Sequence, residues 1–324
     1  RGHYAINNHI HHFAIKQRIY APAIHVGFGG NVAVGMHAAN NLIHDTPHGG
    51  ILYGSHKNII EYNEMFRMCQ ESGDLGGIYS ADKPGRKIGK SGFGNNIIRH
   101  NFEHHGVKSR GIYIDFEQNH DKVYGNITYG LKLGYLIKHG NGTPHYVVNN
   151  MSINNDHDFN VARIEGNVFR NNISVNSGTG SKNLIGAKME VVDEGKDDTA
   201  VLRLNGNPGF KNPENMDFRF KSDSHVFKKR PDWEQIPMPK IGLCLDKYRT
   251  SLPPESKLTL SDFVIIPTEL SIGKVSASTE NPSLQAVNAF DNNPHTCWQP
   301  AGDTPDWHKS NWLMVDFGKI RPVK

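Results

Sequence analysis

Cysteine is scarce in this chain, and no run of apolar residues is long. The 324 residues include three cysteines, Cys69, Cys244 and Cys297, which lie far apart and form no CxxC pair. This spacing argues against a disulfide-built fold and against a structural zinc site. No apolar run approaches the roughly 20 residues that a transmembrane helix needs, so we expect no transmembrane segment.

A strong charge imbalance is also absent. The chain has 36 basic and 32 acidic residues, a net charge of +4, and its basic residues are scattered. No basic cluster contains the interleaved aromatic residues that are typical of proteins binding single-stranded nucleic acid, so we expect no nucleic-acid partner. No signal peptide is present, but Arg1 lies in an apparent repeat and Lys324 in an apparent strand. We therefore expect both ends to be cut, and the missing signal carries no weight.

Two short themes alternate along the first 175 residues. One is Asn followed by Ile at the next or second position, and the other is Gly followed by a short apolar run. The first theme occurs at Asn8-His9-Ile10, Asn41-Leu42-Ile43, Asn58-Ile59-Ile60, Asn96-Ile97-Ile98, Asn126-Ile127 and Asn172-Ile173. The second occurs at Gly50-Ile51-Leu52, Gly77-Ile78-Tyr79, Gly111-Ile112-Tyr113 and Gly134-Tyr135-Leu136. Short strands with no helical spacing between them predict an all-β solenoid.

The composition supports this prediction. Asn and Gly tolerate the left-handed backbone conformation that solenoid corners require. Stacked Asn side chains can also bond the backbone of the next coil, which accounts for most of the Asn content. Hydrophobic residues make up only 37% of the chain, which suits a thin continuous core.

Composition changes divide the chain into three parts. We predict a β-helix over residues 1–230, because Val201-Leu202-Arg203-Leu204 and Phe218-Arg219-Phe220 still resemble strands. Residues 231–269 form a Pro-rich tail that we expect to pack over the last coil, since a solenoid end must hide its open strand edges. Residues 270–324 form a third part.

The third part resembles the start of a discoidin-like module, the coagulation factor V/VIII type C domain. The resemblance rests on motifs in a specific order, and it stops well short of a whole module. The motifs are Val275-Ser276-Ala277-Ser278, Ala286-Val287-Asn288-Ala289-Phe290-Asp291-Asn292-Asn293, Thr296-Cys297-Trp298 and Trp312-Leu313-Met314-Val315-Asp316-Phe317-Gly318. The resemblance implies a truncated carbohydrate-binding β-sandwich, with a possible structural calcium ion near the turn from Asp291 to Thr296. Asn292 stands where members usually have Gly.

Two acidic residues accompany the Gly-Ile-Tyr motifs. Asp74 lies just before Gly77-Ile78-Tyr79, and Asp115 ends Gly111-Ile112-Tyr113-Ile114-Asp115. A lone Asp at a strand end often caps a turn. Two acids on successive or near-successive coils can share one surface, and a carboxylate pair is what glycoside hydrolysis requires.

These motifs resemble glycoside hydrolase family 141, whose members are right-handed parallel β-helix enzymes that act on plant cell-wall glycans. The resemblance covers roughly residues 1–245. It rests on Asn58-Ile59-Ile60-Glu61-Tyr62-Asn63, Glu71-x-x-Asp74-x-Gly76-Gly77-Ile78-Tyr79, Gly111-Ile112-Tyr113-Ile114-Asp115 and Val123-Tyr124-Gly125-Asn126. It implies that Asp74 and Asp115 are the two catalytic acids and that the activity is α-L-fucosidase- or xylanase-like. Members usually have a second acidic residue where this chain has Phe116.

Further residues are candidates for substrate contact. His44 and His48 belong to a histidine-rich first half, where repetition at one coil position also indicates stacked turn residues. Glu61 and Glu71 would contact substrate or tune the Asp pair. Tyr79 and Tyr113 should point outward and would form an aromatic floor for a sugar ring, or simply stack on each other. The histidine spacing predicts no metal site. A basic loop, Lys83-Pro84-Gly85-Arg86-Lys87-Ile88-Gly89-Lys90, would wall the cleft or be a solvated insertion.

The sequence thus predicts a secreted, periplasmic or cell-surface glycoside hydrolase that needs no cofactor and acts on a plant or other complex polysaccharide. Two alternatives stay open. One is a β-helix polysaccharide lyase acting on a uronate-containing glycan, for which Lys83, Arg86 and Lys87 would supply cations. The other is a non-catalytic carbohydrate-binding surface protein.

Overall fold

The structure of the chain is a computed structural model that describes residues 2–27, 34–80, 93–115, 118–138, 145–161, 167–178, 200–263, 274–277, 285 and 313–316. The chain divides into two compact units, residues 1–263 and residues 264–324. Within the described residues α1 (Val226–Lys229) is the only α-helix. No helix among those residues has the length and apolar character needed to cross a membrane.

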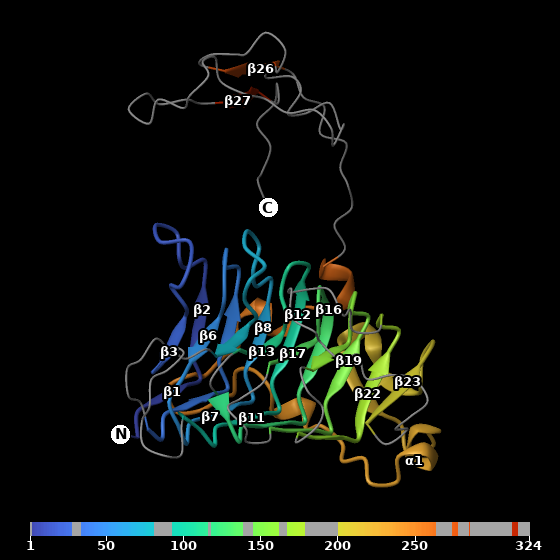
Figure 1. Cartoon of the computed structure of the whole chain (residues 1–324). Helices are drawn as coiled ribbons and strands as arrows, with labels where there is room; N and C mark the ends of the chain where they lie inside the picture. Colours follow the sequence, from blue (N-terminus) through green and yellow to red (C-terminus); the bar gives the residue numbers. More distant parts are fainter. Residues whose placement is uncertain are drawn as a thin grey trace. The chain divides into compact units, whose positions relative to one another are not determined.

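Three parallel sheets, named A, B and C here, wind through the first unit, and successive coils place their strands side by side (Figure 1). Sheet A contains β1 (Tyr4–Ile6), β4 (His37–Ala39), β7 (Ile59–Glu61), β11 (Ile97–Arg99), β15 (Lys122–Tyr124), β18 (Tyr146–Val148) and β21 (Val168–Arg170). Sheet B contains β2 (His9–His11), β5 (Leu42–His44), β8 (Glu64–Phe66), β12 (Phe102–Gly106), β16 (Ile127–Leu131), β19 (Met151–Ile153), β22 (Asn172–Val175) and β23 (Val201–Leu204). Sheet C contains β3 (Ile24–Val26), β6 (Ile51–Tyr53), β9 (Ile78–Ser80), β13 (Ile112–Ile114), β17 (Tyr135–Ile137) and β20 (Phe159–Val161). The predicted all-β parallel solenoid is confirmed.

A ladder of buried asparagines lies at the corner between sheets A and B. Each side chain accepts hydrogen bonds from the backbone N–H and side-chain amide of the Asn one coil earlier; Asn63 Nδ2, for example, lies 2.9 Å from Asn101 Oδ1. The ladder starts at the exposed Asn8, which only donates, and continues through the buried Asn41, Asn63, Asn101, Asn126, Asn150 and Asn172. Residues just before it, such as Asn40 and Asn149, adopt positive φ. The predicted stacking of Asn residues is therefore confirmed, and it satisfies buried polar groups that the sharp corner leaves unpaired.

Glycines explain the other half of the repeat. At the turn before sheet C, a Cβ on Gly76 would lie 2.0 Å from the carbonyl oxygen of Gly111, and a Cβ on Gly111 would lie 2.1 Å from that of Gly134. Gly111 also has a φ of +54°. Only glycine permits this close approach of backbones, so glycine repeats in the turns before β6, β9, β13 and β17.

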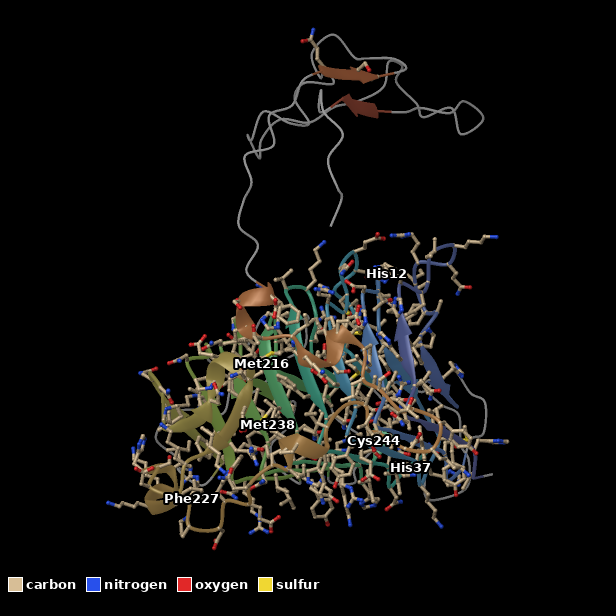
Figure 2. All side chains as sticks on the ribbon, turned by 180° about the vertical axis from the view of Figure 1, so that it is seen from behind. His12, His37, Met216, Phe227, Met238 and Cys244 are labelled. Carbon is tan, nitrogen blue, oxygen red and sulfur yellow. The ribbon has the colours of Figure 1, made fainter. Side chains whose placement is uncertain are left out.

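The tail corrects one prediction. We expected residues 231–269 to cover the last coil and residues 205–230 to belong to the β-helix, but residues 205–263 pack along the outer face of sheet B over many coils. Phe210, Phe218 and Trp233 bury Ile127, Ile173 and other outward apolar residues of sheet B. Nearer the N-terminal end of sheet B, Leu243 packs on Leu42 of β5 and Phe66 of β8. Figure 2 shows the labelled tail residues Phe227, Met238 and Cys244 spread across the breadth of the first unit.

Short elements organise the tail and the solenoid loops. β24 (Phe210–Asn212) pairs antiparallel with β25 (Asp217–Phe220), and β10 (Phe93–Gly94) pairs with β14 (Gln118–Asn119). The 3₁₀ turns are Pro213–Asn215, Met238–Lys240, Pro254–Lys257 and Leu260–Phe263. In the second unit, β26 (Lys274–Ala277) pairs antiparallel with β27 (Leu313–Asp316). The predicted calcium turn from Asp291 to Thr296 lies outside the described residues.

Glu103 and Asp121 are buried carboxyl groups in the solenoid, and Glu64 is partly buried against it. Glu103 accepts hydrogen bonds from the backbone N–H of Gly77 at 3.1 Å, and Asp121 accepts one from the Tyr53 hydroxyl at 3.1 Å. Glu64 lies under the tail next to Gly242. Burial raises the pKa of Glu64 to about 8 and the pKa values of Glu103 and Asp121 to about 7.

Three histidines are shifted in the opposite direction. Burial lowers the pKa of His100 to about 4 and the pKa values of His104 and His105 to about 3. Each of these rings contacts an aromatic neighbour; His105 stacks on Phe263 with centroids 3.8 Å apart. The native state therefore holds these imidazoles neutral where the unfolded chain would protonate them.

These opposed shifts predict the pH dependence of stability. A carboxyl group with a raised pKa loses its stabilising effect as pH rises, so the free energy of unfolding should fall from about pH 6.5 to pH 8. The lowered histidine pKa values reduce the free energy of unfolding as pH falls through about 4 to 3. Between about pH 4 and pH 6.5 the carboxyl groups and the histidines change the free energy of unfolding in opposite directions. Thermal unfolding from pH 3 to 8 checks this, and Glu103→Gln should flatten the alkaline limb. A melting temperature that stays constant above pH 6.5 would contradict the prediction.

Candidate functional site

Asp74 and Asp115 belong to adjacent coils. Strands β9 and β13 are neighbours in sheet C, and Tyr79 lies opposite Tyr113 in their register. Asp74 lies in the turn before β9, and Asp115 follows β13 directly. The side chain of Asp74 is 75% exposed and that of Asp115 is 12% exposed. The two acids thus approach the same pair of tyrosines from opposite ends of the strands.

Tyr79 and Tyr113 share one hydrophobic cluster with Ile78 and Ile112 and are 5% and 1% exposed, so the predicted aromatic floor is closed to solvent. The two tyrosine rings instead pack on each other, edge to face, with centroids 4.9 Å apart. The Tyr79 hydroxyl donates a hydrogen bond to Asp115 Oδ2 at 2.9 Å. Burial first, and the Asp115 charge second, raise the pKa of both phenols. Both tyrosines therefore stay protonated hydrogen-bond donors.

Two cations, which the sequence reasoning missed, pair with the acids. Arg110 forms an ion pair with Asp74, and its guanidinium lies 5.6 Å from the centroid of the Tyr113 ring. Lys138 Nζ lies 2.9 Å from Asp115 Oδ1 and 5.2 Å from the same centroid. Both cations, each paired with one of the acids, thus lie near the same ring. Lys138 could have been found from its position in the repeat, because it directly follows β17 just as Asp115 directly follows β13.

Tyr20 and His48 complete this cluster. The backbone N–H of Tyr20 donates to His48 Nδ1 at 3.1 Å, and the two rings lie 5.2 Å apart. Burial raises the pKa of Tyr20, and the charges of Asp74 and Asp115 raise it further. Burial lowers the pKa of His48, while Asp74 opposes that shift. Tyr20, 47% exposed, is an accessible aromatic side chain near both acids, and no motif in the sequence marked it.

Glu71 lies next to this cluster, but its carboxylate is engaged elsewhere. Its backbone N–H bonds to the carbonyl oxygen of Pro47 at 3.1 Å, and its exposed side chain forms an ion pair with Arg18. The predicted basic loop, residues 83–90, lies outside the described residues. The predicted residues that the structure brings together are therefore Asp74, Asp115, His48, Tyr79 and Tyr113, with Glu71 at the edge.

The other two predicted residues lie on different sheets. His44 is on the outer face of sheet B, where its ring stacks on Phe66 with centroids 4.5 Å apart. Glu61 is on sheet A and bonds His37 Nε2 at 2.8 Å and Arg99 Nε at 2.5 Å. His44 and Glu61 follow Asn-Ile motifs, whereas the two acids accompany Gly-Ile-Tyr motifs. The chain changes direction between the two motifs in each coil, so His44 and Glu61 lie on other sheets than the acids.

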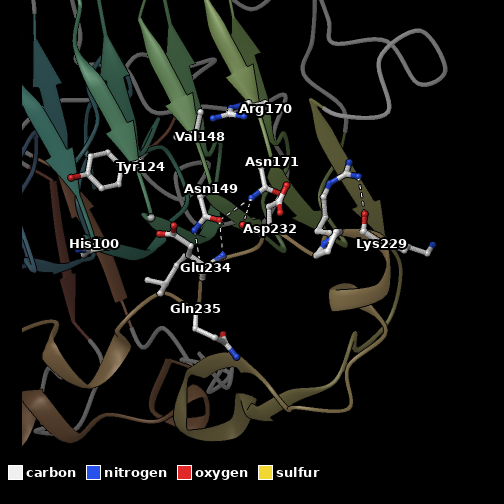
Figure 3. Close-up of a pocket in the computed structure, with 14 residues that line it drawn as sticks. His100, Tyr124, Val148, Asn149, Arg170, Asn171, Lys229, Asp232, Glu234 and Gln235 are labelled. Carbon is white, nitrogen blue, oxygen red and sulfur yellow. Dashed lines mark hydrogen bonds between the residues drawn. The ribbon is translucent and has the colours of Figure 1, made fainter.

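A separate groove of about 750 Å³ lies between the sheet A–B corner and the tail (Figure 3). Asn149 forms its floor by bonding both backbone groups of Glu234, with Nδ2 2.9 Å from the Glu234 oxygen. Its charged lining residues are Arg170, Lys229, Asp232 and Glu234. None of the predicted site residues lines this groove.

Comparisons with known proteins give no match. No family model matches the chain, and no similar protein was found among curated proteins or solved structures. Neither resemblance drawn from the motifs therefore gains support from these comparisons.

Proposed function

We propose that the outer face of sheet C hydrolyses glycosidic bonds, with Asp74 and Asp115 as its two acids. One observation carries the proposal: the two acids lie on adjacent coils, and their partner cations, Arg110 and Lys138, lie 5.6 and 5.2 Å from the centroid of the same ring, that of Tyr113. Two acids on a surface with an accessible aromatic ring match the requirements of sugar stacking and acid–base cleavage.

The surroundings of each acid suggest its role. Asp115 is nearly buried, and Lys138 and the Tyr79 hydroxyl both contact its carboxyl group, so its position is fixed for the role of base. Asp74 is mostly exposed, so its side chain can turn toward the leaving oxygen. The spacing of the two carboxyl groups decides the stereochemical outcome, with about 5–5.5 Å for retaining and about 6.5–9.5 Å for inverting enzymes. Proton NMR of the first product anomer tests this.

Polysaccharide lyase chemistry is the second candidate, and the two cations favour it. Arg110 and Lys138 would neutralise a uronate carboxylate, and the Tyr79 hydroxyl, which donates to Asp115, would carry the proton. In this mechanism Arg110 and Lys138 supply the cations that the sequence analysis assigned to Lys83, Arg86 and Lys87. The second unit, whose described strands β26 and β27 pair antiparallel, would serve as a sugar-binding sandwich in either case, and an extracytoplasmic location would suit both.

The products distinguish these functions. The whole chain is incubated with xylan, fucosylated pectic glycans and polyuronates, and products are followed by reducing-end assay and ultraviolet absorbance. We expect new reducing ends without absorbance. Absorbing unsaturated products would establish the lyase instead. Glycan binding without any cleavage would overturn both and leave a surface adhesin.

A further inference from the structure

A histidine cluster at the first coils of sheet B is not used by the proposed site. It contains His9, His11 and His12 from the first coil and His44 and Asp45 from the next. The ring of His11 stacks on that of His44, with centroids 5.0 Å apart and an angle of 5°. The sequence indicated such stacking, and the structure confirms it, but stacking does not explain where the ring nitrogens point.

The nitrogen atoms of these rings converge. His9 Nε2 lies 2.8 Å from His44 Nε2, and His11 Nδ1 lies 2.9 Å from His12 Nδ1. On the other edge of its ring, His44 Nδ1 lies 2.6 Å from Asp45 Oδ2. One ligand atom from each of His12, His44 and Asp45 lies within 4.8 Å of the others. Ligand atoms at such mutual distances fit around a single cation with bonds of about 2.0–2.2 Å.

We propose that His12, His44 and Asp45 form a binding site for a divalent transition-metal ion, of which zinc is the reference case. Imidazole and carboxylate ligands suit this class of metal, whereas calcium and magnesium prefer all-oxygen sites. Three protein ligands leave a fourth position for water, and His12 lies exposed at the surface (Figure 2). The site links two coils through ligands from β5 and the turns after β2 and β5.

Neighbouring residues hold the ligands in place. A hydrogen bond from His44 Nε2–H to His9 Nε2 would leave the His44 Nδ1 lone pair free for the metal. His9 would then be an outer-shell partner, the kind of residue that commonly fixes the tautomer of a metal-binding histidine. Arg67 donates to both oxygens of Asp45, at 2.6 and 2.8 Å, and so fixes the carboxylate. The Arg67 charge also repels a cation, so removing it should tighten binding.

Calorimetry with the whole, chelator-treated chain tests the site, using ZnCl₂ as the probe. We expect one ion per chain and at least a tenfold weaker affinity in His12→Ala and Asp45→Asn. His225→Ala, an exposed histidine on another part of the first unit, is the matched control and should bind as the wild type does. Arg67→Met should bind more tightly. Cobalt(II) should give visible absorption bands in the wild type that His12→Ala loses.

Several outcomes would overturn the proposal. These are no zinc binding by the wild type, undiminished binding by His12→Ala, or equal binding of magnesium. His12 is exposed, so its loss should leave the fold intact even if His44 variants do not fold. Zinc binding is measured without any glycan, so the result is independent of the proposed hydrolase function.

Discussion

Replacing Asp115 with Asn is expected to lower kcat for glycan hydrolysis by about 100- to 10,000-fold, the range associated with a lost acid or base. Asn keeps the shape of the side chain and can still accept from the Tyr79 hydroxyl, but it can neither carry the charge nor move the proton. Asp74→Asn should act similarly. Initial rates on the best substrate, with circular dichroism of each variant, provide the measurement.

The control for this prediction is Asp156→Asn. Asp156 is an exposed acid that pairs with Lys132 at 3.0 Å, so its loss reproduces a broken ion pair away from the tyrosines. Because Asp115→Asn leaves Lys138 without its carboxylate, Asp115→Asn/Lys138→Gln separates lost chemistry from lost stability. A folded Asp74→Asn/Asp115→Asn variant with full activity would refute the role of the pair.

The solenoid was predictable because its two repeats report close backbone contacts. Asn63 occupies a corner where the previous coil needs an acceptor, and Gly111 occupies a turn where the next coil leaves no room for a Cβ. Both requirements recur in coil after coil, so they are visible in the sequence as repeated letters. Neither requirement depends on a distant part of the chain.

The tail was placed wrongly because its location depends on a distant surface. Outward residues of sheet B, among them Phe102 and Ile127, are apolar, and the tail buries them. In three-residue strands, inward and outward apolar residues look alike in the sequence. An excess of apolar residues at both alternating positions was the signal available, and it marks a sheet covered on both faces.

The candidate site was predictable only where its residues share a motif. Asp74, Asp115 and the two tyrosines accompany Gly-Ile-Tyr starts, and they lie together. His44 and Glu61 share the Asn-Ile motif instead, which places them on sheets B and A. Tyr20 comes from an irregular segment whose course no periodicity fixes, so its approach to both acids emerges only in three dimensions.

Gly111→Ala is expected to destabilise the first unit by about 4 kcal/mol or more, the range of exceptional single substitutions. Two costs combine at this position. An L-residue at a φ of +54° costs about 1–2 kcal/mol, and the new Cβ would lie 2.1 Å from the Gly134 carbonyl oxygen. Because that oxygen belongs to the backbone of the next coil, relief requires the coils to separate.

Gly130→Ala isolates the first cost from the second. Gly130 has a φ of +63°, yet a Cβ there would meet no atom nearer than 3.9 Å. This variant should therefore lose only the conformational term, and the difference between the two urea-unfolding free energies measures the backbone overlap. Equal losses in both variants would mean that the coils can move apart at little cost. In that case the turn that carries Arg110 would not be rigid enough to hold its ion pair with Asp74, and the spacing of the proposed acids would depend on the substrate.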